Sequence, residues 1–225
     1  MVRSITSIPF RAAIVVASFG IVTLLGTRAQ TTAISPVRSE TNPGASNAPA
    51  EKLRLAGIPN AGKISDVLLR GAQPSEKGFA QLKKLGVTTI VNLRDESREV
   101  VWERKVTESL GLRYVNIPVR GWSPPFDNQV AQFLKLFQDT AGQRIFVHCY
   151  YGDDRTGVMV ATYRIAQQDW TADQAVKEMY FFGFHHSLYP NMKSYVRRFP
   201  ATFANESVFS ALRATHAPSA EAKKP

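Results

Sequence analysis

The chain contains one cysteine, Cys149, and an arginine follows it six residues later at Arg155. A thiolate is a strong nucleophile, and the planar guanidinium of an arginine matches two oxygens of a phosphate group. A lone cysteine cannot form an intrachain disulfide, so its neighbours decide between a reactive thiol and a buried structural residue. The types and spacing of this pair predict nucleophilic attack on a bound anion.

The segment around the pair has the pattern of a strand, a loop and a helix. Residues 144–147 are largely apolar and indicate a strand that runs into His148 and Cys149, and residues 156–168 indicate a helix. Ligands of open α/β sheets bind beyond the carboxyl ends of strands, where a helix N-terminus also attracts anions. Gly152 allows the loop to curl and Gly157 allows close packing. We expect Cys149 to be substantially thiolate near neutrality, because helix N-termini and cations favour that form.

The elements that must position this loop alternate along the chain. Asp127 occupies a position suited to a helix N-cap. Strands alternating with helices predict an α/β fold with a mostly parallel central sheet flanked by helices on both faces. We expect further strands over residues 67–70, 87–93 and 113–117, and helices over residues 75–85, 99–110, 127–141, 171–181 and 190–199.

The loop resembles the signature of the cysteine-dependent protein tyrosine phosphatase superfamily, in which His-Cys-x-x-Gly-x-x-Arg is followed by Ser or Thr. Residues 69–75 (LRGAQPS) and 91–96 (VNLRDE) look like the opening segments of the small atypical dual-specificity phosphatases of bacteria, plants and fungi. The resemblance covers about residues 55–200. The loop reads His148-Cys149-Tyr150-Tyr151-Gly152-Asp153-Asp154-Arg155-Thr156-Gly157.

The resemblance implies a phosphomonoester hydrolase of the tyrosine or dual-specificity type. Cys149 would form a phosphocysteine, and Arg155 with the loop N–H groups would bind the phosphoryl oxygens. Thr156 would hydrogen-bond the sulfur and help it leave. His148 would brace the loop and tune the thiol through hydrogen bonds, and would not act as a base. No metal and no cofactor is implied. The other substrate-binding positions would be Tyr150, Tyr151, Gly152, Asp153, Asp154 and Gly157.

The family protonates the leaving oxygen with an aspartate on a loop before the signature. Asp127, just after the loop at residues 119–126, is the main candidate, although Asp127 could serve only as a helix cap. Asp95, which follows a different strand, is the alternative.

The acidic residues of the loop bear on the substrate. If they pointed inward, Asp153 and Asp154 would repel both the thiolate and the substrate, so we expect them to point outward or to bind basic groups. Their acidity disfavours a very dense anion such as an inositol pyrophosphate as the substrate. A phosphotyrosine-like monoester is favoured, with an inositol phosphate or phosphoinositide as the alternative. A rhodanese-type sulfurtransferase is disfavoured because its loop is typically shorter and lacks the Arg-Thr-Gly exit. A catalytically inactive phosphate-binding module is disfavoured because Cys149 and Arg155 are intact.

Composition and charge agree with an enzyme acting on an anionic substrate. The chain has 225 residues, a formal net charge of +10 and the apolar content of a globular protein. The basic residues are spread along the chain, and no basic run is interleaved with aromatic residues, so we expect no nucleic-acid partner.

The ends of the chain differ in character from its middle. An apolar stretch at residues 12–25, flanked by Arg3 and Arg11, indicates a signal peptide over residues 1–29 or a retained membrane tether. We expect a flexible linker at 30–52, a catalytic domain at 53–203 and a tail at 204–225. The catalytic domain should then be periplasmic, secreted or anchored outside the cytoplasm, and the oligomeric state stays open.

Overall fold

The computed structural model describes residues 48–138 and 142–216, and a mixed sheet lies at the centre of this part of the chain. Its order is β1-β2-β3-β6-β4-β5, in which β3, β6, β4 and β5 are parallel and β1 and β2 form an antiparallel edge. The prediction of a mostly parallel sheet is therefore confirmed. The strands are β1 Glu51–Lys52, β2 Gly62–Lys63, β3 Leu68–Gly71, β4 Thr89–Asn92, β5 Arg113–Asn116 and β6 Ile145–His148.

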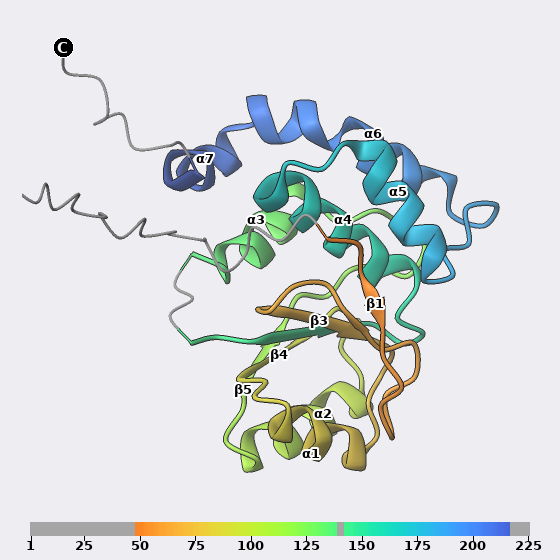
Figure 1. Ribbon diagram of the computed structural model, residues 1–225, viewed down its shortest axis with the longest axis vertical. Coiled ribbons are helices and arrows are strands. Elements are labelled where there is room, and N and C mark those ends of the chain that lie inside the picture. Colours follow the sequence, from red (N-terminus) through yellow and green to blue (C-terminus); the bar gives the residue numbers. More distant parts are fainter. Residues whose placement is uncertain (1–47, 139–141, 217–225) are drawn as a thin grey trace, which may run out of the picture. The chain divides into compact units, whose positions relative to one another are not determined.

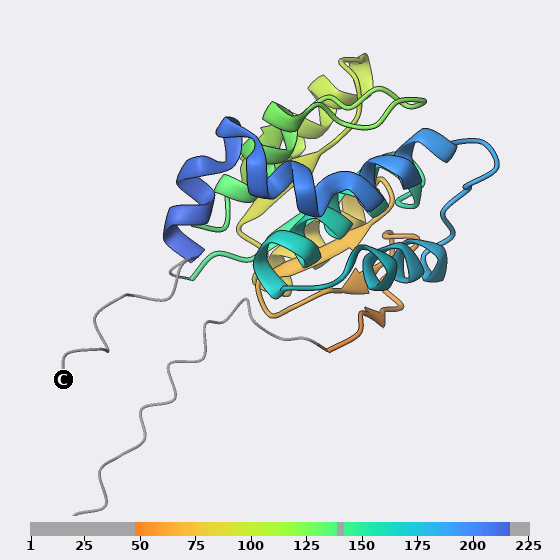
Figure 2. The ribbon, with the colours of Figure 1, turned by 90° about the horizontal axis from the view of Figure 1, so that it is seen from above.

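Helices cover both faces of the sheet (Figure 1). Two helices, α1 and α2, lie on one face, and α3, α4, α5 and α6 lie on the other. Seen from above, α6 extends across α4, against which it packs (Figure 2). The bounds are α1 Glu76–Lys84, α2 Arg98–Ser109, α3 Asp127–Lys135, α4 Asp154–Gln168, α5 Ala172–Phe181, α6 Pro190–Asn205, a 3-10 turn Ser207–Phe209 and α7 Ser210–His216.

The two faces are built by the alternation of side chains along each strand. Val91 of β4 and Val147 of β6 point into the core shared with α3 to α6, and both are fully buried. Their neighbours Ile90 and Phe146 point the other way, into the core shared with α1 and α2. Because apolar side chains of these two strands point to both faces, their middle positions are apolar in succession, as expected for a doubly covered sheet.

The domain begins before residue 53, which corrects the expected linker boundary. Glu51 and Lys52 pair with β2, and the Ala50 N–H donates to the Glu178 carboxylate at 3.2 Å. Glu178 in turn forms a buried ion pair with Arg164, 2.7 Å away. Residues 48–52 therefore belong to the folded domain, and the remainder of the linker lies outside the described residues.

The expected tail also begins too early at residue 204. After α6 the chain forms a short turn and α7, and Phe209 and Leu212 are buried in the core beside Phe199. The Phe199 and Phe209 rings meet edge to face with centroids 5.6 Å apart. Two apolar side chains three positions apart thus fasten this segment to the domain, and residues 217–225 lie outside the described part.

Within the described residues, none of the helices combines the length and the apolar content that crossing a membrane requires. The segment at residues 12–25, on which the signal peptide and membrane tether were predicted, lies outside those residues.

Candidate active site

The candidate site lies where three parallel strands end. The register places Gly71 of β3 and Asn92 of β4 beside His148 of β6. Cys149 follows directly, and α4 begins at Asp154, slightly earlier than predicted. The nucleophile candidate therefore stands at the carboxyl edge of the sheet, in front of a helix N-terminus.

The loop after Cys149 turns its carbonyl groups away from the sulfur. Tyr150 O accepts from the Gln73 N–H at 3.1 Å, and Gly152 O accepts from the Asn60 side-chain amide at 3.2 Å. In contrast, the Gly152 N–H donates to the Cys149 sulfur at 3.3 Å. With carbonyls outward and an amide inward, the loop has the form of an anion cradle around the sulfur.

Gly152 is required by both its conformation and its surroundings. Its φ of +75° is in the left-handed region, where side chains are disfavoured. A Cβ at this position would lie 2.4 Å from the backbone carbon of Gly71. Gly157 is less restricted, because the nearest atom to a Cβ there would be Cγ of Met179, at an ordinary contact distance of 3.4 Å. Met179 of α5 packs against the buried Gly157, as expected, although the space there does not exclude a Cβ.

Sequence reasoning missed Arg70 as part of this site. Arg70 is 1% exposed, its Nη2 donates to Gly152 O, and its guanidinium lies 4.0 Å from the centre of the Phe182 ring. Burial lowers the pKa of Arg70 to about 10, which leaves the group charged at neutral pH. The signal was an arginine inside an otherwise apolar strand, because a buried cation needs specific acceptors.

Arg155 is anchored by the backbone at the ends of β4 and β5. Its Nη1 donates to Val119 O at 3.2 Å and to Leu93 O at 3.5 Å, and lies 3.9 Å from the Asp95 carboxylate. These contacts fix the guanidinium in a cavity of about 370 Å³. The cavity is lined by Arg94, Asp95, Glu96, Ser97, Tyr150, Tyr151 and Arg155.

His148 braces the loop from inside the protein. Its Nδ1 lies 3.0 Å from Cys149 O, and its Nε2 lies 2.8 Å from Oε1 of Glu103. Both side chains are fully buried. Glu103 was also missed by sequence reasoning, although a glutamate that continues the buried stripe of α2 with Val100 and Thr107 was a usable signal.

Thr156 does not make the bond to sulfur that was expected of it. The side chain is fully buried, and its hydroxyl has no hydrogen-bond partner within the described part of the chain. The donor to Cys149 sulfur is the Gly152 N–H instead. A buried hydroxyl without a partner is a group available to a later state of the reaction.

Asp153 and Asp154 are turned toward a basic residue, one of the two arrangements expected. The His185 N–H donates to Asp154 at 2.8 Å, and His185 Nδ1 lies 3.5 Å from Asp153 and 3.4 Å from Asp154. Burial raises the pKa of Asp154. Among the described residues these three form the group whose atoms lie close enough to hold a metal ion, and their mutual contacts account for them without one.

The two candidate acids have different surroundings. Phe126 occupies the N-cap of α3, so Asp127 is its first helical residue, and the expected N-cap is wrong by one position. Asp127 accepts from the Tyr195 hydroxyl at 2.8 Å. Asp95 instead lines both the Arg155 cavity and a second one of about 450 Å³. The second cavity is lined by Asp95, Pro118, Arg120, Ser123, Pro124, Pro125, Phe126 and Gln129.

Aromatic side chains surround the mouth of the site. Tyr150 and Tyr151 are exposed, and the Arg94 guanidinium lies 5.1 Å from the Tyr150 ring centre. Trp122 and Phe126 are exposed as well, so they are not core residues. Tyr150 and Tyr151 line the Arg155 cavity and Phe126 lines the second cavity, so these three rings offer apolar surface that an aromatic substrate could contact.

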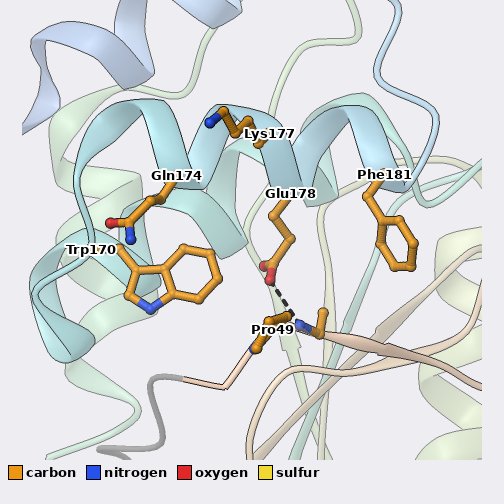
Figure 3. Close-up of a pocket in the computed structure, with 7 residues that line it drawn as sticks. Pro49, Trp170, Gln174, Lys177, Glu178 and Phe181 are labelled. Carbon is orange, nitrogen blue, oxygen red and sulfur yellow. Dashed lines mark hydrogen bonds between the residues drawn. The ribbon is translucent and has the colours of Figure 1, made fainter.

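A further hollow of about 350 Å³ lies away from these residues (Figure 3). Figure 3 shows the Glu178 carboxylate directed at the backbone next to Pro49. The Ala50 N–H donates to this carboxylate, which connects α5 to the segment that precedes β1. None of its lining residues belongs to the site described above. They are Pro49, Ala50, Trp170, Gln174, Lys177, Glu178 and Phe181.

Comparisons with known proteins agree with this geometry. TpbA of Pseudomonas aeruginosa (strain UCBPP-PA14), a dual specificity protein phosphatase, is 32% identical over 129 residues, which are 56% of this chain and 55% of TpbA. The chain thus spans about half the length of the curated relatives it matches. The crystal structure of P. aeruginosa TpbA has a TM-score of 0.56 at 27% identity, covering 71% of this chain and 99% of that chain.

Two further structures extend the comparison. TpbA in complex with pTyr matches with a TM-score of 0.56 at 26% identity, covering 72% of this chain and 99% of that chain. The catalytic domain of the PP-IP phosphatase Siw14 from S. cerevisiae, with a TM-score of 0.56 at 18% identity, covers 65% of this chain and 88% of that chain and shares the fold. A family model described as "DSP-PTPase phosphatase fused to NAD+ Kinase" matches residues 59–192. The chain belongs to this family of dual-specificity-type cysteine phosphatases.

Proposed function

We propose that the chain hydrolyses phosphomonoesters through a phosphocysteine intermediate, with Cys149 as the nucleophile. The observation that carries this proposal is the cradle in which the Gly152 N–H points at the sulfur at 3.3 Å while the loop carbonyls point away. The thiolate attacks phosphorus, an S–P bond forms, and the P–O bond to the leaving group breaks. Water then attacks phosphorus, which releases inorganic phosphate and regenerates the thiolate.

Arg155 and the loop amides stabilise the charge on the transferred phosphoryl group. The Nη1 atom of Arg155 is held by the carbonyls of Leu93 and Val119. A bidentate contact to phosphate uses the other two guanidinium nitrogens. Because the protein already holds the guanidinium in place, little ordering is required when the substrate binds.

Asp95 supplies the proton to the leaving oxygen in this proposal. Its carboxylate lies 3.9 Å from Arg155 and lines both cavities at the mouth, whereas Asp127 is bonded to Tyr195. Asp95→Asn and Asp127→Asn can be compared on p-nitrophenyl phosphate, whose leaving group needs little protonation, and on phenyl phosphate. We expect Asp95→Asn to slow the hydrolysis of phenyl phosphate by about 10²-fold or more, with a smaller effect on p-nitrophenyl phosphate. The same selective loss in Asp127→Asn would assign the role of general acid to Asp127 instead.

The substrate class supported best is a phosphotyrosine-like aromatic monoester. The exposed rings of Tyr150, Tyr151 and Phe126 border the two cavities at the mouth, and TpbA has been crystallised with pTyr. A second candidate is an inositol phosphate or phosphoinositide. It is favoured by Arg94 and Arg120, which line the cavities.

The decisive assay is phosphate release from phosphotyrosine peptides, phosphoinositides and inositol phosphates, with Cys149→Ser as the blank. We expect release from phosphotyrosine peptides by the wild type and none by the variant. Full activity in Cys149→Ser would disprove the mechanism. Turnover of thiosulfate in place of phosphoesters would support a sulfurtransferase.

We also propose that the domain works outside the cytoplasm. The support is the sequence of residues 1–29, where basic residues flank the apolar stretch at 12–25. Fractionation of cells that express the full chain, with N-terminal sequencing of the product, tests both parts of this proposal. A mature N-terminus near residue 30 indicates a cleaved signal peptide, an intact one in the membrane fraction indicates a tether, and a cytosolic product contradicts the proposal.

A further inference from the structure

A buried pair of titratable side chains lies behind the signature loop. The mechanism proposed above assigns no step to this pair. Glu103 comes from α2 and His148 ends β6, and neither side chain is exposed to solvent. Their closest atoms, Glu103 Oε1 and His148 Nε2, are 2.8 Å apart. Burying two such groups is costly unless each is fully hydrogen-bonded, so their partners indicate which atom carries the proton.

The imidazole of His148 has one fixed donor. Its Nδ1 lies 3.0 Å from the carbonyl oxygen of Cys149. A carbonyl oxygen only accepts hydrogen bonds, so Nδ1 must carry a proton. Whether Nε2 carries a second proton then depends on the Glu103 carboxyl.

The other oxygen of Glu103 has two fixed partners. Arg94 donates from its side chain to Gln73 Oε1 at 2.8 Å and from its backbone to Asn92 Oδ1 at 2.8 Å. Arginine and backbone N–H groups only donate, so these contacts fix the orientation of both amides. Gln73 and Asn92 must therefore direct N–H groups at Glu103 Oε2, which lies 2.7 Å from each of them.

The pair thus holds a single proton between His148 Nε2 and Glu103 Oε1. Two N–H groups donate to Oε2, an arrangement that suits a carboxylate.

The family resemblance implies that His148 braces the loop and tunes the Cys149 thiol. We propose that Glu103 is the positioning residue that keeps His148 in its imidazolium form, so that this tuning favours the thiolate. The proposal rests on the function proposed above, since it concerns the same nucleophile. Glu103 does not touch the substrate and acts through His148.

Other charged groups face the same loop and have to be kept constant in a test. Arg70 and Arg155 flank the loop, and Asp153 lies within it. Behind Glu103, burial raises the pKa of the Tyr114 hydroxyl, and the Glu103 charge raises it further, so Tyr114 stays neutral. None of these groups has to be changed to test the role of Glu103.

The variant Glu103→Gln separates charge from geometry. The amide oxygen of the new side chain can accept from Asn92 and Gln73, and its NH₂ group can donate to His148 Nε2. All the hydrogen bonds are kept, but the imidazole must then be neutral, because its Nε2 has to accept. Glu108→Gln is the matched control, since Glu108 is exposed on the same helix.

The primary readout is the rate at which iodoacetamide alkylates Cys149, measured against pH. Because Cys149 is the sole cysteine, alkylation reports its thiolate directly and does not require turnover. We expect Glu103→Gln to move the profile about one unit toward higher pH, so that alkylation at about pH 6 falls about tenfold. The kcat/KM for p-nitrophenyl phosphate should fall in parallel, whereas Glu108→Gln should match the wild type.

An unchanged alkylation profile in a folded Glu103→Gln protein would overturn the proposal. If that variant does not fold, the ¹⁵N chemical shifts of the His148 ring in the wild-type protein decide instead. Two protonated nitrogens support the proposal and one contradicts it. A shifted alkylation profile in a protein without phosphatase activity would leave this inference standing and refute the function proposed above.

Discussion

Replacing Thr156 by valine should make the protein more stable and less active. The Thr156 side chain is fully buried and its hydroxyl lacks a partner among the residues described. Leaving a buried hydroxyl unpaired costs about 1–3 kcal/mol, and valine has nearly the same shape without that group. We expect the free energy of unfolding to rise by about 1 kcal/mol, which is about 2–4 °C in Tm for a domain of this size.

The same change should slow the second chemical step. When phosphocysteine is hydrolysed, the sulfur leaves as a thiolate. The family resemblance implies that the Thr156 hydroxyl, which has no partner among the described residues, donates to that sulfur. A hydrogen bond to a charged group is worth about 1.5–3 kcal/mol, which corresponds to about a 10- to 150-fold slower step. Formation of the intermediate should be little affected.

Rapid mixing with p-nitrophenyl phosphate separates the two steps. Thr156→Val should give a burst of nitrophenol close to one equivalent, followed by a slow steady state. Thr156→Ser, which retains a hydroxyl, should turn over at close to the wild-type rate. A Thr156→Val protein that is less stable than the wild type and equally active would show that the hydroxyl is neither unpaired nor a donor to sulfur.

Three further changes test other parts of the site. Gly152→Ala places a Cβ 2.4 Å from the Gly71 backbone at a φ of +75°, so phosphate release should fall at least about 10-fold and thermal unfolding should shift down by several degrees. Asp154→Asn should stabilise the protein near neutral pH, because burial raises the folded-state pKa of Asp154 and its ionisation therefore disfavours folding. The gain in the free energy of unfolding, measured with a chemical denaturant, should disappear as the pH falls below that pKa. Tyr195→Phe removes the hydroxyl bonded to Asp127 and should lower the free energy of unfolding by about 1 kcal/mol. The ratio of the hydrolysis rates of p-nitrophenyl phosphate and phenyl phosphate should not change, which kinetics on the two substrates would check.

The parts of the site that lie close together in the sequence could be predicted from it. A continuous segment of the chain contains the strand, Cys149, the loop and the following helix. The short spacing between Cys149 and Arg155 places both residues at the same end of that helix. Glu103 and Arg70 were missed because their roles depend on contacts with residues 45 and 82 positions away in the sequence. A single sequence shows them only as polar residues at apolar positions.

The domain boundaries were misjudged for a related reason. The edge strand β1 has two residues, too few for an alternating pattern to be recognised. Its place is fixed by pairing with β2 and by the bond from Ala50 to Glu178, both of which need the folded domain. At the other end, a few apolar residues in a polar segment were enough to pack α7 against the core.

The contacts around Gly152 explain how an acidic loop can serve an anion-binding site. Asn60 and Arg70 hold its carbonyl outward, and its N–H group points at Cys149. The loop carboxylates are engaged on another side, where His185 binds both. Their negative charge is therefore directed into contacts within the protein, while the Gly152 N–H group faces the sulfur. The loop composition consequently restricts the substrate less than the sequence suggested, and discrimination must depend more on the arginine and aromatic side chains at the mouth.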